Sequence, residues 1–422
     1  MSTQNEYEDL IIDVTPSSQY ALKNGSTHLY VQLKITGVHS EEKEQRTNMN
    51  LGVVLDRSGS MHGSKLQKSK EAIEFIVNNL TNEDQFALTI YDHRVDTIIP
   101  SSKLINPTSI ISRIRSIRDR GRTNLHGGLM EGFKQVKNGK LLEYRNILLL
   151  LSDGLANEGI TDRTRMCESV KNIYEGGIGI STFGVGDDFD EDLMVDIADN
   201  GGGHFYFIQT ADDIPKYIEQ EFSGLLTTTA YNIEVEWENL DVKLRRVLGI
   251  PYQDRYSNNI RLGDLRSGNE ILVILDIDIP PSSDREKRKE ILKFKIKWIP
   301  RKGSVTPIEA KIPCTITYTT DETFLSIEDE HVIENVHLLE TAFIQYEVMR
   351  MADRGDFKGA LRVMEVMQEK LKTQVAQTGS INLQRLHQQN ALMMDEVLNV
   401  EKYDRVTRKQ LRSSMYELRK RR

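Results

Sequence analysis

The stretch that decides the fold is LGVVLDRSGSM, at residues 51–61. An apolar run of strand length ends at Asp56, and Ser58 and Ser60 follow at alternate positions of one short loop. In open α/β sheets, ligands bind beyond the carboxyl ends of the strands. Asp56, Ser58 and Ser60 all carry oxygen donors, which are the ligands that hard divalent cations such as Mg²⁺ prefer.

Two later stretches supply further oxygen donors. Thr123 lies in GRTNL, and Asp153 follows a second apolar run, with one serine between, in ILLLLSDG. Because parallel strands end at the same sheet edge, we expect Asp56 and Asp153 to lie close together. The sequence therefore predicts a metal site formed by Asp56, Ser58, Ser60, Thr123 and Asp153. Hydroxyls would bind the metal, and the carboxylates would hold metal-bound waters or the serines.

This prediction depends on the whole set of five. An Asp after a strand is also an ordinary helix N-cap, so the Asp-x-Ser-x-Ser pattern alone is weak. Arg57 and His62 flank the loop. We leave open whether Arg57 pairs with an incoming carboxylate, pairs with Asp153 or is solvated.

Residues 46–225 alternate apolar strands with amphipathic helices, which predicts a doubly wound, Rossmann-like α/β domain with a mostly parallel sheet. The predicted strands are MNLGVVL, FALTIY, NILLLLS, GIGISTFGVG and HFYFI. The predicted helices are 65–80, 108–118, 125–137, 163–175 and 212–225, the last capped by Asp212. The direction of FALTIY within the sheet is left open.

The flanking regions have a different character. Residues 226–327 alternate as strands with one wet face and predict an antiparallel β-sandwich domain. Residues 1–45 share this pattern, so we expect residues 27–36 to pair with this region and the α/β domain to be an insertion. Residues 328–422 carry apolar stripes at helical spacing and predict a helical bundle. We interpret the lysines of KFKIKW (residues 293–298) as a solvated strand face.

Composition excludes several classes of function. The chain has 422 residues, a formal net charge of −8 and a pI of about 5.7, which argues against a general nucleic-acid binder. The start MSTQNEYEDL is polar, so we expect no signal peptide there. No apolar run approaches the roughly 20 residues that span a bilayer. The two cysteines lie far apart, so we expect no disulfide framework and a cytoplasmic location.

The motifs DRSGSM, GRTNL and LSDGLANEG resemble, in order and context, the von Willebrand factor A (VWA) domain and its metal-ion-dependent adhesion site (MIDAS). The resemblance covers about residues 46–225 and implies that Asp56, Ser58, Ser60, Thr123 and Asp153 are the site residues. The flanking β region and SDGLANEGIT are similar to inter-alpha-trypsin inhibitor heavy chains and their bacterial relatives. Intracellular bacterial members resemble adaptors, some beside AAA+ ATPases, which implies such a complex as a partner.

We therefore predict a non-enzymatic adaptor that captures an Asp or Glu of a partner protein at a Mg²⁺ ion. Mn²⁺ and Ca²⁺ are alternatives, since oxygen ligands accept all three. A second hypothesis is a scaffold protein with a vestigial metal site. A third is a phosphoryl-transfer enzyme with Asp56 as the nucleophile. It is less favoured, because Ser58 replaces the second Asp of the haloacid dehalogenase pattern and no phosphate-binding loop or nucleophile elbow occurs.

Overall fold

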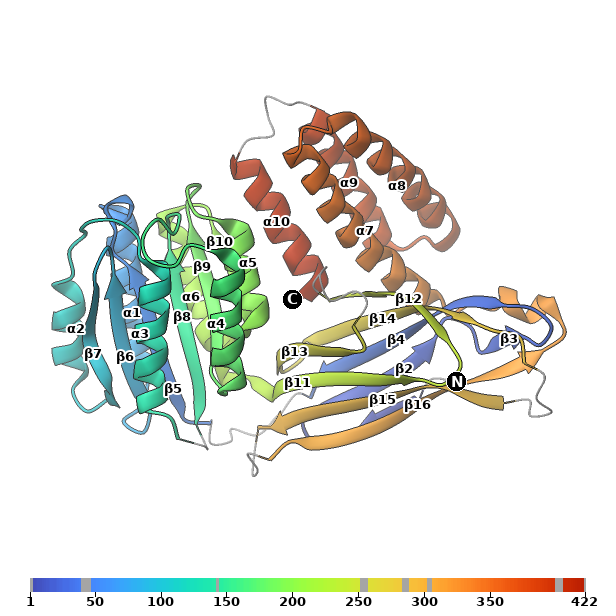
Figure 1. Cartoon of the computed structure of the whole chain (residues 1–422), viewed down its shortest axis with the longest axis horizontal. Coiled ribbons are helices and arrows are strands. Elements are labelled where there is room, and N and C mark those ends of the chain that lie inside the picture. Colours follow the sequence, from blue (N-terminus) through green and yellow to red (C-terminus); the bar gives the residue numbers. More distant parts are fainter. Residues whose placement is uncertain are drawn as a thin grey trace. The chain divides into compact units, whose positions relative to one another are not determined.

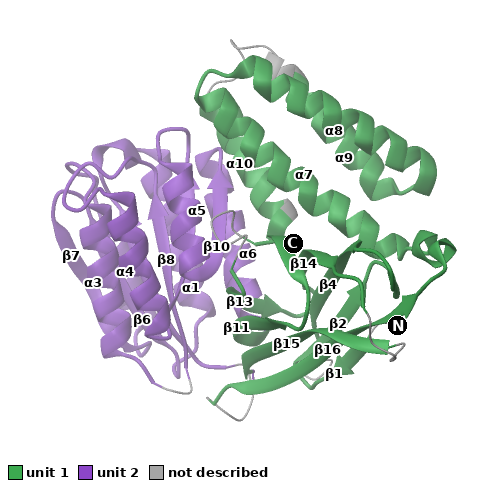
Figure 2. Ribbon diagram, turned by 45° about the vertical axis from the view of Figure 1, so that its right-hand side comes forward, with its two compact units in different colours: residues 1–40, 229–300, 306–422 green, residues 41–228, 301–305 purple. Residues whose placement is uncertain are grey.

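The computed structural model describes residues 3–38, 47–141, 144–250, 257–282, 288–301, 306–398 and 405–420 (Figure 1). The chain divides into two compact units (Figure 2). The first comprises Met1–Ser40, Thr229–Pro300 and Thr306–Arg422, and we call it the β/helical unit. The second comprises Glu41–Thr228 and Arg301–Val305, and we call it the α/β unit.

The α/β unit is built on a sheet with the strand order β10-β9-β8-β5-β6-β7. Its strands are β5 (Met49–Asp56), β6 (Gln85–Tyr91), β7 (Val95–Lys103), β8 (Arg145–Ser152), β9 (Gly179–Val185) and β10 (Gly202–Ile208). All pairings are parallel except that of β7 with β6. The five predicted strands are confirmed, and FALTIY runs parallel to β5. The edge strand β7 was not predicted, because its half-exposed residues show no clear alternation.

Helices cover both faces of this sheet. They are α1 (Ser64–Asn79), α2 (Pro107–Arg115), α3 (Leu125–Asn138), α4 (Arg163–Glu175), α5 (Glu191–Asn200) and α6 (Ile214–Leu226). Leu51, Val53 and Leu55 of β5 share a core with α1 and α6, whereas Gly52 faces α3. The short helix α5 was not predicted. The Asp212 cap is wrong, since Asp212 lies within a 3₁₀ turn that precedes α6.

Two five-stranded sheets form a β-sandwich in the β/helical unit. One has β1 (Thr3–Glu6), β2 (Leu10–Pro16), β4 (Thr27–Gly37), β14 (Glu270–Ile279) and β12 (Lys243–Leu248). The other has β13 (Asn259–Arg266), β11 (Thr228–Asn239), β15 (Arg288–Pro300), β16 (Ile308–Thr319) and β3 (Tyr20–Leu22). The pairing predicted for residues 27–36 is confirmed, because β4 is antiparallel to β14 along its length.

The lysine face of β15 lies against acidic residues. Lys293, Lys295 and Lys297 stand opposite glutamates of β11 at positions 238, 236 and 234. Opposite charges across two strands stabilise a solvated sheet face, in line with the interpretation from the sequence. Beneath this face, Trp298 belongs to the sandwich core.

The last part of the chain is helical, as predicted. It contains α7 (Glu330–Asp353), α8 (Phe357–Thr378), α9 (Ile381–Leu398) and α10 (Arg405–Lys420). Gly355, with φ of +80°, allows the tight turn between α7 and α8. Methionines such as Met364 and Met393 are buried in the core between these helices. None of the helices within the described ranges is both long and apolar enough to cross a membrane.

An ion cluster fastens α7 to the sandwich. Glu340 of α7 pairs with Arg246 of β12 and, at 2.6 Å, with Lys370 of α8. Arg246 also contacts Asp276 of β14, with 3.0 Å between Nε and Oδ2. Helices and sandwich are thereby joined within one unit.

Candidate metal centre

The predicted site lies where the central strands of the α/β unit end. Strands β5 and β8 are parallel neighbours, with Leu55 opposite Leu151. Asp56 is therefore the last residue of β5 beside the end of β8, and Asp153 follows β8 directly. Strand β5 is flanked by β6 on one side and β8 on the other, so the strand order reverses here. This is the position at which open α/β sheets bind ligands.

Asp56 is a buried carboxyl group held by neutral partners. Its side chain has no exposed surface. It accepts hydrogen bonds of 2.8 Å from the Ser58 amide and from the Ser152 hydroxyl. Burial raises the pKa of Asp56 to about 6, against the hydrogen bonds, which favour the charged form. A cation placed here would relieve this cost of burying the charge.

The two serines lead from Asp56 to Asp153. The hydroxyl of Ser58 lies 3.0 Å from that of Ser60, which in turn donates a 2.7 Å hydrogen bond to Oδ1 of Asp153. Asp56, Ser58 and Asp153 are buried, whereas Ser60 is exposed. The site therefore opens to solvent on the side of Ser60.

Thr123 completes the group from a separate loop. Backbone hydrogen bonds hold that loop in place, from the Gly59 amide to the Gly121 carbonyl and from the Asn157 amide to the Thr123 carbonyl. A Cβ atom added at Gly154 would lie 3.4 Å from Oγ1 of Thr123 and 3.5 Å from Oγ of Ser60. Both hydroxyls thus face one small space, which the glycine leaves open.

The five predicted side chains are therefore brought together, and their chemistry fits a hard cation. They offer three neutral hydroxyls and two carboxylates, all oxygen donors. In the part of the chain that the structure describes, no three His, Cys, Asp or Glu side chains are grouped to hold a metal ion. Serine and threonine hydroxyls would consequently have to supply much of any cation site here.

Arg57 neither pairs with Asp153 nor is solvated. Its side chain is only 11% exposed and forms ion pairs with Asp92, at 2.9 Å, and with Asp96. Asp92 also accepts a 2.9 Å hydrogen bond from Arg120. Although burial alone would raise the pKa of Asp92, its hydrogen bonds and the two arginines lower it. This cluster fastens the loop after β5 to β6 and to the loop that carries Thr123.

The cation that contacts Asp153 is Lys65, which was not among the residues predicted from the sequence. Its ammonium nitrogen lies 2.6 Å from Oδ2 of Asp153. Lys65 is the second residue of α1, and the first turn of α1 holds no acidic residue. A lysine is unfavourable at a helix N-terminus, where the dipole is positive. A lysine at this position of the sequence could therefore have indicated that an acidic side chain lies close to it in the fold.

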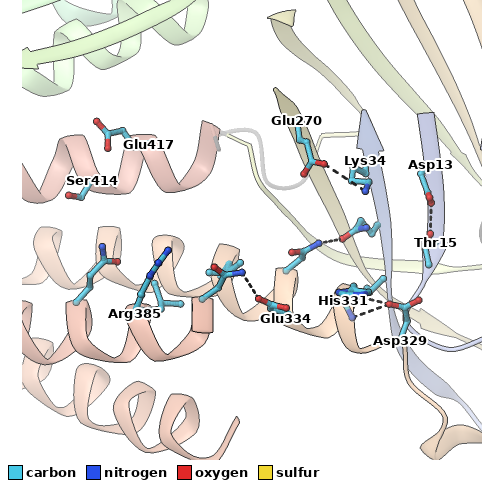
Figure 3. A pocket seen from close by; sticks show the side chains of 17 residues that line it. Asp13, Thr15, Lys34, Glu270, Asp329, His331, Glu334, Arg385, Ser414 and Glu417 are labelled. Atoms are coloured by element: carbon cyan, nitrogen blue, oxygen red, sulfur yellow. Dashed lines mark hydrogen bonds and ion pairs between the residues drawn. The ribbon is translucent and has the colours of Figure 1, made fainter. Parts of the chain in front are cut away.

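A larger hollow lies in the β/helical unit, between the β4 sheet and the helices (Figure 3). It has a volume of about 880 Å³ and a mostly polar lining. Most of its carboxylates already have partners. Asp329 caps α7, Glu334 accepts from Ser380 and Asn382, and Glu270 lies 3.8 Å from Lys34. We therefore place the candidate function in the α/β unit.

A doubly wound sheet with hydroxyl and carboxylate donors at its switch point defines the class of VWA-like α/β proteins. The family model for the von Willebrand factor type A domain matches residues 50–220. Residues 50–220 therefore form a VWA domain.

Relatives and solved structures agree with this assignment. The chain is 28% identical to the uncharacterized protein YfbK of Escherichia coli K12 over 63% of this chain and 51% of YfbK. It is 26% identical to the uncharacterized protein sll0103 of Synechocystis, over 58% of this chain and 61% of that protein. Human inter-alpha-trypsin inhibitor heavy chain H1 is 27% identical over 47% of this chain and 23% of its own length. The chain thus spans about half to three fifths of the first two relatives.

Two solved structures share the fold over both units. One is a von Willebrand factor type A protein from Catenulispora acidiphila, with a TM-score of 0.68, 14% identity and coverage of 90% of this chain and 89% of that one. The other is the ArnB paralog VWA2 from Sulfolobus acidocaldarius, with a TM-score of 0.62, 17% identity and coverage of 96% and 98%. The combination of VWA domain, sandwich and helices therefore recurs in other proteins.

Proposed function

We propose that this chain is a non-enzymatic adaptor that binds a partner protein through a divalent cation at a MIDAS. Ser58, Ser60 and Thr123 would hold the cation, and Asp56 and Asp153 would orient the serines or cation-bound water. The observation that carries the proposal is the convergence of hydroxyl and carboxylate oxygens on one solvent-open space beside Gly154. VWA domains typically bind a divalent metal in this way, which supports it.

The donor set suits capture of a ligand rather than a closed structural site. Neutral hydroxyls leave much of a dipositive charge uncompensated, and Mg²⁺ keeps several exchangeable waters. When bound, the cation supplies an electrophilic centre for an Asp or Glu carboxylate of the partner. Mg²⁺ is the proposed ion, with Mn²⁺ and Ca²⁺ as alternatives.

The cellular setting is part of the same proposal. The two cysteines, Cys167 and Cys314, are free thiols. We place the protein in the cytoplasm, where thiols stay reduced. An AAA+ ATPase complex, implied by the resemblance to bacterial adaptors, is the first partner to test.

Metal binding is tested on the full-length chain by isothermal titration with Mn²⁺ and with Mg²⁺. Thr123→Val and Ser60→Ala each remove one hydroxyl and should weaken binding at least tenfold. Ser64→Ala is the matched control, because Ser64 is an exposed serine four residues further along. Equal affinities in all four proteins would contradict the assigned ligand set.

Partner binding is tested by affinity capture from native lysate with Mg²⁺ and with EDTA, followed by mass spectrometry. Asp56→Ala should lose the Mg²⁺-dependent partners while keeping the circular dichroism of the wild type. The same partners with and without metal would overturn the adaptor mechanism.

The Lys65–Asp153 ion pair supports one alternative function, a scaffold with a vestigial metal site. The ammonium already neutralises one of the two carboxylates. The scaffold predicts no binding of Mg²⁺ or Mn²⁺ and partner capture that survives both EDTA and the Asp56→Ala change.

A further inference from the structure

Lys65 reaches into the candidate metal centre from helix α1. The two oxygens of Asp153 are divided between Lys65 and Ser60, with the ammonium 2.6 Å from Oδ2 and the serine hydroxyl 2.7 Å from Oδ1. The side chain of Lys65 is 26% exposed, so its charge is only partly screened by water. On its other side it lies near Gly186 after β9, where an added Cβ would be 3.2 Å from Nζ.

We propose that Lys65 couples the binding of the cation to the binding of an acidic ligand, an inference that rests on the proposed function. Lys65 competes with the cation for Asp153 and thereby weakens binding of the metal alone. It also gives the metal-loaded site a positive charge that an incoming carboxylate neutralises. Lys65 is thus a residue that sets the specificity of the site for anions.

The charge balance of the buried groups supports this role. Asp56 and Asp153 together carry two negative charges, which a divalent cation would neutralise. With Lys65 present, the loaded site keeps one positive charge. A carboxylate from a partner restores neutrality, so cation and anion each favour the binding of the other.

The ion pair with Asp153 stabilises Lys65 at an otherwise unfavourable position of helix α1. Lys65 lies in the first turn of a 16-residue helix, where the positive end of the dipole disfavours a lysine. Asp153 compensates this repulsion. Lys68, one turn further along α1, instead contacts Glu71 at 3.1 Å and Asp212 at 3.8 Å, away from the metal centre. These two lysines therefore form a matched pair for experiment.

Titration of the full-length chain with Mn²⁺ alone tests the first half of the proposal. Lys65→Met keeps an unbranched side chain only one atom shorter and removes its charge, and Lys68→Met makes the same change on the same helix. A unit charge a few ångströms from a divalent ion changes affinity by roughly tenfold or more, even when partly screened. We expect Lys65→Met to bind Mn²⁺ about tenfold more tightly, and Lys68→Met and Lys65→Arg to stay within roughly twofold of the wild type.

The second half is tested by repeating the titrations in acetate and in chloride at equal ionic strength. Acetate serves as the carboxylate probe. It should raise the apparent Mn²⁺ affinity of the wild type by a larger factor than that of Lys65→Met. An equal gain in both proteins would overturn the coupling, because the anion would then not sense Lys65.

The outcomes separate this inference from the proposed function. If the wild type binds Mn²⁺ and Lys65→Met binds it equally or less tightly, the inference is wrong and the metal site stands. If only Lys65→Met binds Mn²⁺, Lys65 blocks the site and the proposed function of the wild type fails. If neither binds, both fail. Lys65→Gln, with circular dichroism as a check of folding, is the second neutral variant and should behave as Lys65→Met does.

Discussion

Replacing Asp56 by asparagine should stabilise the α/β unit when no divalent cation is present. Asp56 has no exposed surface, and its pKa is raised to about 6 because burial disfavours the charged form. Asparagine has nearly the same size and carries no charge. It keeps an acceptor for the Ser58 amide, and the Ser152 hydroxyl can rotate to accept from the new amide group.

The magnitude follows from the pKa. A rise from 3.8 to about 6 corresponds to about 3 kcal/mol at pH 7, since each pH unit is worth about 1.36 kcal/mol. Turning the Ser152 hydroxyl from donor to acceptor for the new amide group costs about 1 kcal/mol, the value of one hydrogen bond. The net gain in the free energy of unfolding is therefore about 2 kcal/mol at pH 7 in EDTA. Mg²⁺ or Mn²⁺ should stabilise the wild type but not Asp56→Asn.

The dependence on pH has a definite sign. The folded state binds the Asp56 proton more tightly than the unfolded state, whose pKa is about 3.9. The wild type therefore loses stability through this group as the pH rises from about 4 to above 6. Below about pH 4 the carboxyl is protonated in both states and the cost is absent. The advantage of Asp56→Asn should accordingly fall close to zero at about pH 4.5.

Hydrogen exchange of the β5 and β8 amides in the full-length chain measures the free energy of unfolding of the α/β unit. Asp92→Asn is the matched control, because Asp92 is equally buried but ion-paired with Arg57 and Arg120, so its loss should destabilise at pH 7. Both tryptophans, Trp237 and Trp298, lie in the β/helical unit, and their fluorescence transition should not move. Lower stability of Asp56→Asn than of the wild type in EDTA at pH 7 would refute the reasoning.

Three further substitutions test the two units separately. Gly52→Ala would place its Cβ 2.5 Å from Cγ2 of Val136, and this overpacking should cost the α/β unit about 1–3 kcal/mol by hydrogen exchange. Glu221→Gln in α6 should cost about 1–3 kcal/mol in the same assay, because the buried carboxylate accepts two 2.6 Å hydrogen bonds from hydroxyl groups. Glu340→Ala removes the carboxylate at the centre of the α7 ion cluster. It should lower the free energy of unfolding of the β/helical unit, followed by tryptophan fluorescence in urea, by about 2 kcal/mol. Hydrogen exchange in β5 should not change.

The site could be predicted from the sequence because its position follows from strand order. A continuous apolar run such as residues 147–151 is typical of a strand buried on both faces. Parallel neighbours end at one edge, so residues that follow two such runs must lie near each other. This reasoning needs no knowledge of helix positions, and it placed Asp56 and Asp153 correctly at one edge.

What could not be predicted depends on contacts between elements. Strand β7 is a half-exposed edge with Pro100 in it, and it is a strand only because β6 offers an antiparallel partner. Helix α5 has ten residues, too few for a clear periodicity, although Asp190 caps it. Both elements are stabilised by contacts with neighbouring elements, and the order of polar and apolar residues within each element does not reveal those contacts.

The two cations near the loop show the same limit at the level of single residues. Arg57 is adjacent to Asp56 in sequence, yet its side chain forms ion pairs with Asp92 and Asp96. Lys65 is nine residues away and contacts Asp153, because α1 brings it back over the end of β8. The two carboxylates of the site are consequently unequal. Asp56 is held by an amide and a hydroxyl, both neutral, whereas Asp153 is held by the Ser60 hydroxyl and by the ammonium of Lys65. A divalent cation should therefore gain most from Asp56 and be opposed by Lys65, so neutralising Asp56 and neutralising Lys65 should change metal affinity in opposite directions.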